Sequence, residues 1–411
     1  MSFFTGDLFA GCGGLTAGFK SAGLHTRWAN EYWPPAAATY RISNPDVALY
    51  EEDVRSLLER AVGSSNLRHE LEVDLLCGGP PCQGFSGWNR FRSLEDPRNS
   101  LVEVFLDFVA LLEPRLVLIE NVTGLLSLGD GLVVSGVTEA LGEMGYHVRL
   151  MVLQAGGYGV PQNRWRVFIA GSKDKAGLLE PPAAIHAFPR TTVFNATSFR
   201  SNVLRPPYEP SQGFFSSILP HVTVADALSD LPSLENGGDL EASSLAPAQS
   251  EFQSILRSEG TTVSCHRTVR LEEVNMERVR ALKAGQSWVH LPENLKPNNL
   301  KNTPGQRYPN RFGRLEWTGI FNTIINKAEP YWSRVIHPTD DRVISVRESA
   351  RAQGLPDRID FQGALRQQYA QVGNAVPPPL AKAIGWEMRR ALGDRTVDEE
   401  VESYRTKMHN R

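Results

Sequence analysis

Asp7-Leu-Phe-Ala-Gly-Cys-Gly-Gly-Leu15 is the stretch that decides the fold of this 411-residue chain. A short apolar run leads into a turn with three glycines, and a helical pattern begins directly after it. Glycine lets such a turn take backbone conformations that other residues avoid, and the following helix start offers unpaired N–H groups. We interpret these residues as a strand, a tight turn and a helix that together open a βα unit.

The residues after this stretch continue to alternate short apolar strands with helical patterns as far as Gly171. Strands are expected at 3–9, 25–31, 72–77 and 115–119, and helices at 14–22, 34–42, 101–112 and 132–144. Residues 146–153 and 166–171 have the pattern of a closing antiparallel pair. Together they predict an α/β fold, a mostly parallel Rossmann-like sheet with helices on both faces.

The composition of the sequence changes after Gly171. Proline, asparagine and serine become frequent there, and the alternation of strands and helices stops. Two further helical patterns follow at 343–353 and 379–390. We predict four parts, which are a first domain at 1–171, a smaller irregular lobe at 172–340, C-terminal helices at 341–392 that rejoin the first domain, and a polar tail at 393–411.

Charge gives mixed indications about the partner of this protein. The net charge of −3 and the pI near 6.3 are unlike those of nucleic-acid binders, which usually have a basic footprint. The segment between Glu293 and Glu316 nevertheless carries only basic charges, namely Lys296, Lys301, Arg307, Arg311 and Arg314. This segment fits a solvated loop or a set of phosphate contacts equally well.

Membrane and metal functions find no support in the sequence. No apolar run is long enough to span a bilayer, and no secretory leader is recognisable at the N-terminus. The four cysteines show no paired spacing, which favours a reducing compartment and argues against a structural zinc. We therefore expect no metal ion.

Acidic residues follow the next two apolar segments. Glu31 ends the strand at 25–31 and could accept hydrogen bonds from the two hydroxyls of a ribose, although an isolated glutamate is more often a surface carboxylate. Asp53 follows the apolar residues 47–50, where it could bind the amino group of an adenine. The glycine turn alone fits a dinucleotide site, an S-adenosylmethionine site or a plain tight turn. All three features at successive strand ends predict a nucleoside-containing ligand.

Cys77-Gly-Gly-Pro-Pro-Cys-Gln-Gly-Phe-Ser86 contains a candidate nucleophile. Cys82 follows two prolines, so we expect it to be held rigidly, and it could act as a thiolate if its pKa is lowered. A buried inert cysteine is the more frequent case. That alternative fits Cys12 and Cys77 better, because Cys82 sits in a loop without apolar periodicity.

Two charged motifs complete the set. Glu120-Asn-Val122 comes directly after a buried strand, where a carboxylate is costly unless it lines a site or is paired. Gln162-Asn-Arg-Trp-Arg166 places two arginines at alternate positions, which on one strand face could grip a carbonyl, a phosphate or a carboxylate. A pair of surface arginines is the plain alternative and, for this motif alone, the more common one.

These motifs, followed by Gln371-Val-Gly-Asn-Ala-Val-Pro-Pro-Pro-Leu380, resemble the ordered motif series of the cytosine-5 DNA methyltransferase family over nearly the whole chain. The chain looks closest to the catalytic region of eukaryotic maintenance-type enzymes, to which Trp28-Ala-Asn-Glu-Tyr-Trp33 and Gly313-Arg-Leu-Glu-Trp317 are similar. Animal members bind zinc in the recognition lobe through Cys and His, whereas Cys265 is the one cysteine available here. The regulatory domains that precede the catalytic region in those enzymes are also not found in this sequence. Both departures argue against a maintenance role, and neither argues against the methyl-transfer chemistry.

The resemblance implies a class I methyltransferase that transfers a methyl group from S-adenosylmethionine to carbon 5 of a cytosine flipped out of duplex DNA. Cys82 would add to carbon 6 of the ring, and Glu120 would contact the ring N3 and the exocyclic amine. Arg166 would hold the cytosine carbonyl, with Arg164 close to Cys82 and the target phosphates. A base or water would then remove the proton at carbon 5, and β-elimination would free the thiolate.

The resemblance also implies a cofactor site. Phe9 would stack on the adenine, Glu31 would bind the ribose, and Asp53 would bind the adenine amine. The rest of the site would be lined by Ala10, Gly11, Gly14, Leu15, Tyr32, Val54, Pro80, Asn374 and Val376.

For DNA, residues 84–92 resemble the mobile loop that closes over the flipped base. Trp88 would refill the vacated position, with Arg90 and Arg92 at the flanking phosphates, unless its indole packs on the second lobe and merely anchors the loop. Arg307 and Arg311 are the candidates from the basic segment.

Double-stranded DNA is the expected partner, and the catalytic unit is expected to be a monomer that does not bind a membrane. The expected location is the nucleus of a eukaryote or the cytoplasm of a bacterium. An RNA methyltransferase is one alternative, since a tRNA-directed branch shares the fold and the nucleophile, but its Cys-Phe-Thr segment is not found here. A catalytically inactive regulatory relative is less favoured, because Cys82, Glu120 and the glycine turn are all present.

Overall fold

The computed structural model describes residues 2–81, 100–188, 219–240, 243–244, 246–257, 262–301 and 308–409. The chain divides into two compact units. The first unit comprises Met1–Tyr158, Trp165–Leu219 and Pro378–Arg411, and the second comprises Gly159–Arg164 and Pro220–Pro377.

A seven-stranded sheet forms the centre of the first unit, with the strand order β3-β2-β1-β4-β5-β7-β6. Its strands are β1 Phe4–Leu8, β2 His25–Asn30, β3 Ala48–Tyr50, β4 Leu75–Gly78, β5 Leu116–Val122, β6 His147–Gln154 and β7 Trp165–Ser172. Strands β1 to β5 pair in parallel, whereas β7 pairs antiparallel with both β5 and β6. The predicted α/β fold class and the closing antiparallel pair are confirmed.

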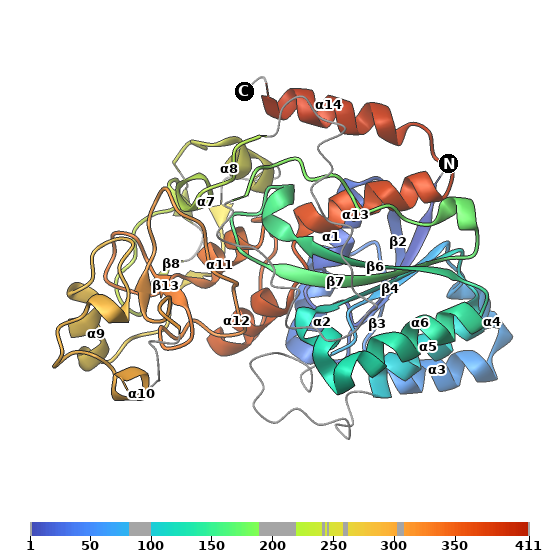
Figure 1. Cartoon of the computed structure of the whole chain (residues 1–411), viewed down its shortest axis with the longest axis horizontal. Coiled ribbons are helices and arrows are strands. Elements are labelled where there is room, and N and C mark those ends of the chain that lie inside the picture. The colour runs from blue at the N-terminus through green and yellow to red at the C-terminus, as the bar shows by residue number, and fades with distance from the viewer. Residues whose placement is uncertain are drawn as a thin grey trace. The chain divides into compact units, whose positions relative to one another are not determined.

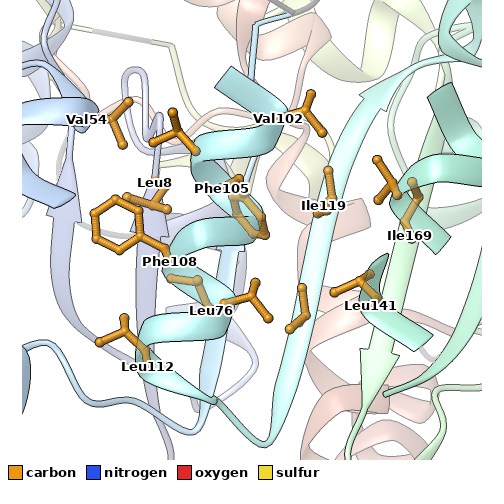
Figure 2. Packing of buried hydrophobic residues seen from close by; sticks show 14 of the residues in the cluster. Leu8, Val54, Leu76, Val102, Phe105, Phe108, Leu112, Ile119, Leu141 and Ile169 are labelled. Carbon is orange, nitrogen blue, oxygen red and sulfur yellow. The ribbon is translucent and has the colours of Figure 1, made fainter. Parts of the chain in front are cut away.

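Helices cover both faces of this sheet (Figure 1). One face carries α3 Val54–Gly63, α5 Ser100–Leu112 and α6 Leu132–Glu143, and the other carries α1 Gly14–Ser21 and α13 Pro378–Ala391. In Figure 2, Phe105 and Phe108 of α5 lie over Leu8, Leu76 and Ile119 of the strands. Because the buried residues of β4 and of β5 as far as Ile119 are nearly all apolar, the sheet needs this cover on both sides.

The first unit also contains α2 Pro34–Ser43, α4 Ser65–Glu70, α14 Val397–His409 and the 3-10 turns η1 Thr123–Gly131, η2 Ala155–Tyr158 and η3 Lys175–Gly177. The predicted polar tail is therefore largely helical. Tyr404 of α14 packs on Trp386 of α13, and Glu400 pairs with Arg389 at 2.6 Å. Apolar contacts and ion pairs thus anchor a helix whose sequence is mostly polar.

The second unit is built from short elements. Its helices are α7 Val224–Leu228, α8 Glu251–Leu256, α9 Glu273–Arg280, α10 Asn298–Lys301, α11 Val346–Ala352 and α12 Leu365–Asn374, with the 3-10 turn η6 Trp288–His290. Its strands form the pairs β8 Asp239–Leu240 with β11 His266–Arg267, β9 Ser243–Ser244 with β10 Thr262–Val263, and β12 Gly313–Arg314 with β13 Arg334–Ile336. These short pieces agree with the smaller irregular lobe of the predicted fold.

The unit boundaries differ from the predicted domain boundaries. Residues 172–219 belong to the first unit, and of the two helices predicted to rejoin it only α13 does so. Helix α11 contacts α7, α12 and β11. The buried guanidinium of Arg351 on α11 pairs with Asp230 and Asp357. These ion pairs hold α11 inside the second unit.

The helices of the described residues are short or polar compared with a membrane span. No single helix among them is long and apolar enough to cross a membrane, and one bent pair, Thr123–Gly129 with Leu132–Glu143, passes by length and composition together.

The close packing of α1 on α13 depends on Gly18. A Cβ atom there would lie 2.4 Å from the Cβ of Ala381 and 2.6 Å from the carbonyl oxygen of Pro378. We expect Gly18→Ala to lower the free energy of unfolding by about 1–3 kcal/mol, the usual cost of overpacking. Gly136→Ala on α6 is the matched control, because a Cβ there meets no atom within 4 Å. Chemical unfolding of both variants checks this, and equal stability of the two would contradict it.

Candidate active site

The glycine turn joins β1 to α1 at the carboxyl edge of the sheet. Its backbone has positive φ at Phe9 (60°), Gly11 (58°) and Gly13 (89°). A Cβ atom on Gly11 would meet no heavy atom of the described residues within 4 Å, so the turn is open on that side. Gly13 is the N-cap of α1. A ligand could therefore approach this backbone closely.

Glu31 lies directly after β2 and braces this turn. Its Oε2 accepts a hydrogen bond from the N–H of Gly11 at 2.8 Å, and its Oε1 accepts one from the N–H of Trp33 at 2.7 Å. Burial raises the pKa of the carboxyl, and the backbone N–H groups counteract that rise. Each oxygen retains a second lone pair that a ligand hydroxyl could use. The contact of Glu31 with a ribose stays a prediction.

The other residues of the first unit predicted to bind a nucleoside are partly exposed and partly buried. Tyr32 is 65% exposed. Asp53 caps α3, with its Oδ1 accepting the N–H of Arg55 at 2.8 Å. Phe9 packs at the edge of the main core. The buried members are Ala10, Gly14, Leu15, Val54 and Pro80.

Glu120 and Arg166 form an ion pair between adjacent strands. Glu120 lies opposite Phe168 and Arg166 lies opposite Val122, so the two side chains are diagonal neighbours on one face of the sheet. Arg166 Nε lies 3.0 Å from Glu120 Oε1, and both side chains are 11% exposed. A carboxylate this deeply placed needs such a partner to stay charged. The structure therefore brings together two of the predicted catalytic residues.

Two contacts that the sequence does not signal shape the surroundings of Glu120. A Cβ atom on Gly79 would lie 3.1 Å from Glu120 Oε2, so any side chain there would press on the carboxylate. Asn121 Nδ2 donates to the carbonyl of Pro80 at 3.3 Å. This bond ties the end of β5 to the segment that leads to Cys82. The predicted site residues Cys82, Trp88, Arg90, Arg92 and Arg307 lie outside the described residues.

The described cysteines, Cys12, Cys77 and Cys265, are all buried. Burial raises the pKa of Cys12 to about 12 and raises the pKa of the other two above its ordinary value. A thiol that stays protonated is a poor nucleophile. These surroundings agree with the inert interpretation of Cys12 and Cys77. Among the described residues, no group of three or more His, Cys, Asp or Glu side chains could hold a metal ion.

Arg164 has surroundings unlike those of Arg166. Strand β7 begins at Trp165 and Arg164 belongs to the second unit, so the expectation that both arginines share a strand face is wrong. Arg164 is 1% exposed. Its guanidinium donates to three backbone carbonyls at 3.0 Å, those of Ile324, Gly373 and Ala375. Arg164 therefore braces the motif at 371–380 from within the second unit.

Asn374 and Val376, which are predicted to line the cofactor site, lie at the end of α12 and just beyond it. Asn374 is exposed and Val376 is buried. Both belong to the second unit, and their contact with a cofactor stays a prediction.

The basic segment does not present a continuous row of cations. Lys296 and Lys301 both pair with Glu293, at 3.0 and 3.3 Å. Arg314 is 4% exposed, and its guanidinium donates to four backbone carbonyls. Three of these cations are therefore engaged within the protein itself, as the loop interpretation expects.

Arg311 keeps a different environment. Its guanidinium carbon lies 4.0 Å from the ring centre of Tyr308 and 5.2 Å from that of Trp332. Stacked guanidinium and aromatic groups suit contacts with nucleic acids. Contact of Arg311 with DNA stays a prediction.

The sequence profile of the family described as C-5 cytosine-specific DNA methylase matches residues 3–390 of this chain. The chain belongs to this family. It is similar to DNA (cytosine-5)-methyltransferase 1 of Gallus gallus, with 35% identity over 468 residues that cover 96% of this chain and 30% of that protein. It is also similar to DNA (cytosine-5)-methyltransferase 1A of Oryza sativa subsp. japonica, with 33% identity over 440 residues that cover 94% and 28%. The chain thus spans about 30% of the length of these curated relatives.

Solved structures resemble this DNA methylase family member in fold. A prophage-encoded protein of E. coli, assigned as a DNA modification methyltransferase, matches with a TM-score of 0.69 and 24% identity, covering 96% of this chain and 100% of that chain. The Dnmt2 methyltransferase of S. pombe matches with a TM-score of 0.51 and 12% identity, with the same coverage. The seven-stranded sheet is therefore of the class I methyltransferase type.

The narrow space at Gly79 gives a test of the Glu120 carboxylate. For the methyl transfer proposed below, we expect Gly79→Ala to lower kcat about tenfold, because a small displacement of an active-site group disturbs the alignment of the reacting atoms. The KM for the cofactor should change less than kcat, since Glu120 is the one residue beyond the chain neighbours of Gly79 that an added Cβ would meet within 4 Å among the described residues. Steady-state kinetics on duplex DNA, with Gly136→Ala as the control, measures both constants. An unchanged kcat would mean that the position of the carboxylate does not limit the reaction.

Substitution by lysine should affect different properties at the two neighbouring arginines, namely stability at Arg164 and kcat at Arg166. Arg164→Lys removes donors from buried carbonyls and should lower the free energy of unfolding by about 1–3 kcal/mol. Arg166→Lys keeps a positive charge beside Glu120, so it should affect kcat more than stability. Chemical unfolding and kinetics on both variants test this division. A stable Arg164→Lys variant with a low kcat would instead place Arg164 in the reaction.

Proposed function

We propose that this chain is a DNA (cytosine-5-)-methyltransferase that transfers a methyl group from S-adenosylmethionine to carbon 5 of a flipped-out cytosine. The match of the family profile to residues 3–390 carries the proposal. The braced glycine turn and the Glu120–Arg166 pair support it, because both lie where open α/β sheets bind their ligands.

The residues at the turn fit S-adenosylmethionine. The backbone is open at Gly11, a carboxylate stands behind it at Glu31, and an exposed aromatic ring lies beside it at Tyr32. We propose that Phe9 stacks on the adenine, that Glu31 binds the ribose hydroxyls, and that Asp53 binds the adenine amine. When bound, the sulfonium supplies the methyl group. Further lining residues are proposed to be Ala10, Gly11, Gly14, Leu15, Val54, Pro80, Asn374 and Val376.

In this proposal, the residues that act on the cytosine are Cys82, Glu120 and Arg166. The Cys82 thiolate adds to carbon 6, which makes carbon 5 nucleophilic enough to take the methyl group. Glu120 binds N3 and the exocyclic amine and stabilises the charge that develops on the ring, while Arg166 orients Glu120 and holds the cytosine carbonyl. A base or water takes the proton from carbon 5. The bond between sulfur and carbon 6 then breaks and returns the thiolate. Arg164, buried among carbonyls, acts by bracing the backbone.

Duplex DNA is the proposed substrate, in the nucleus of a eukaryote or the cytoplasm of a bacterium. The target base has to leave the stack, because carbon 6 is inaccessible inside a duplex. Candidates for holding the opened DNA are Trp88, Arg90, Arg92, Arg307 and Arg311.

The decisive experiment is covalent trapping. DNA that carries 5-fluorocytosine cannot lose a proton at carbon 5, so the wild-type enzyme with cofactor should form an adduct that survives denaturation. Cys82→Ala should form none, whereas Cys265→Ala, which changes a buried cysteine of the second unit, should trap normally. An adduct on the Cys82→Ala variant would overturn the assignment, and methylation of tRNA but not of duplex DNA would favour an RNA substrate.

A further inference from the structure

A chain of buried hydroxyl groups runs beneath the glycine turn. Thr16 Oγ1 donates to Asp7 Oδ2 at 2.9 Å and lies 2.8 Å from the hydroxyl oxygen of Tyr40. A hydroxyl has a single hydrogen. When Thr16 donates its hydrogen to Asp7, Tyr40 is the donor to Thr16. All three residues are at most 2% exposed, so these bonds are shielded from bulk water.

The Tyr40 side chain also contacts the turn itself. A Cβ atom on Gly13 would lie 3.2 Å from the Tyr40 ring and 3.0 Å from Asn44 Nδ2. The ring packs in one apolar cluster with Ala10 and Ala29. Tyr40 therefore contacts the turn at Ala10 and at Gly13, while its hydroxyl reaches the first helical turn of α1 through Thr16.

These contacts join β1, α1 and α2 at one point. Asp7 is on β1, Thr16 on α1 and Tyr40 on α2. Glu31 holds the turn at Gly11 from the end of β2, and Tyr40 holds it at Gly13 from α2. The turn is thus fixed from two places, and the second one depends on a neutral hydroxyl.

We propose that Tyr40 is a positioning residue, whose hydroxyl sets the conformation of the glycine turn through Thr16 and thereby the affinity for S-adenosylmethionine. The inference rests on the proposed function. Tyr40 does not touch the reacting atoms in this proposal, so it acts on binding of the cofactor and leaves the chemical step unchanged.

The test compares matched removals of one buried hydroxyl. Tyr40→Phe should raise the KM and the Kd for S-adenosylmethionine about fivefold, in line with the usual worth of one hydrogen bond. The kcat at saturating cofactor should change less than about twofold. Thr16→Val should weaken the affinity for S-adenosylmethionine as much as Tyr40→Phe does. Thr16→Ser should bind S-adenosylmethionine as tightly as wild type, because serine keeps the hydroxyl. Tyr146→Phe is the control, since that buried hydroxyl donates to the carbonyl of Pro114 at 2.7 Å and has no contact with the turn.

The outcomes separate the inference from the proposed function. If wild-type protein does not bind S-adenosylmethionine in calorimetry, the proposed function fails. If wild-type protein binds it and Tyr40→Phe binds equally well, the positioning role is wrong. Equal losses of affinity in Tyr40→Phe and Tyr146→Phe would also overturn it, because they would reflect stability alone. Melting temperatures of all variants identify any that do not fold.

The pH dependence of stability gives a second readout of the same hydroxyl chain. Burial raises the pKa of Asp7 to about 7, and the Thr16 hydrogen bond is the largest influence against that rise. The titratable groups that face Asp7 are Cys77 on β4, Tyr40 on α2 and Glu31 after β2.

Protonated Asp7 stabilises the fold fully below its unfolded pKa of 3.8, and this contribution is lost as pH rises to about 7. The stability of wild type relative to Asp7→Asn should therefore fall between those pH values and then level off. In a Thr16→Val background the fall should continue to higher pH. An unshifted profile would show that Thr16 does not act on Asp7.

Discussion

The buried carboxylate of Glu31 is the constraint on which the functional edge of the sheet depends. It accepts the N–H groups of Gly11 and Trp33, which the regular ladder of β1 and β2 leaves without strand partners. Phe9 in this turn has a φ of 60°, which is costly for a residue other than glycine unless its surroundings hold it. By fixing the turn after β1 against the start of α2, one side chain links two βα units. The Glu31 carboxylate, which would accept hydrogen bonds from a ligand, thus also accepts hydrogen bonds that the fold requires.

The guanidinium groups of this chain differ in function according to what they contact. Arg166 faces a carboxylate at the end of β5, whereas Arg164 is surrounded by backbone carbonyls. Arg351 pairs with two buried aspartates and holds α11 in the second unit. A guanidinium has five donors in a fixed plane, so it can satisfy several carbonyls of irregular backbone at once. In a unit with few regular elements, that property replaces the hydrogen bonds of sheets and helices.

The sheet and the placement of Glu120 could be predicted because alternation of strands and helices is a local pattern. The same local reasoning failed for Arg164, since Arg-x-Arg looks the same within a strand and at its start, and only the beginning of β7 at Trp165 separates the two cases. Helix α14 has a mostly polar sequence and is held by tertiary contacts to α13. The assignment of α11 depends on Asp230, which lies more than a hundred residues from Arg351. No local signal could reveal either.

Two buried carboxyl groups flank the glycine turn, and they differ in their hydrogen bonds. Burial raises the pKa of both Asp7 and Glu31, and the charge of Glu31 raises that of Asp7 further. Glu31 accepts two backbone N–H groups, whereas Asp7 accepts the hydroxyl of Thr16. Hydrogen bonds to a charged form favour it, and two close carboxylates disfavour double ionisation. The two backbone hydrogen bonds thus favour the charged form of Glu31, whereas burial and the charge of Glu31 disfavour the charged form of Asp7. A ligand hydroxyl at this edge of the sheet would meet the carboxylate of Glu31, because Asp7 is buried beneath the turn.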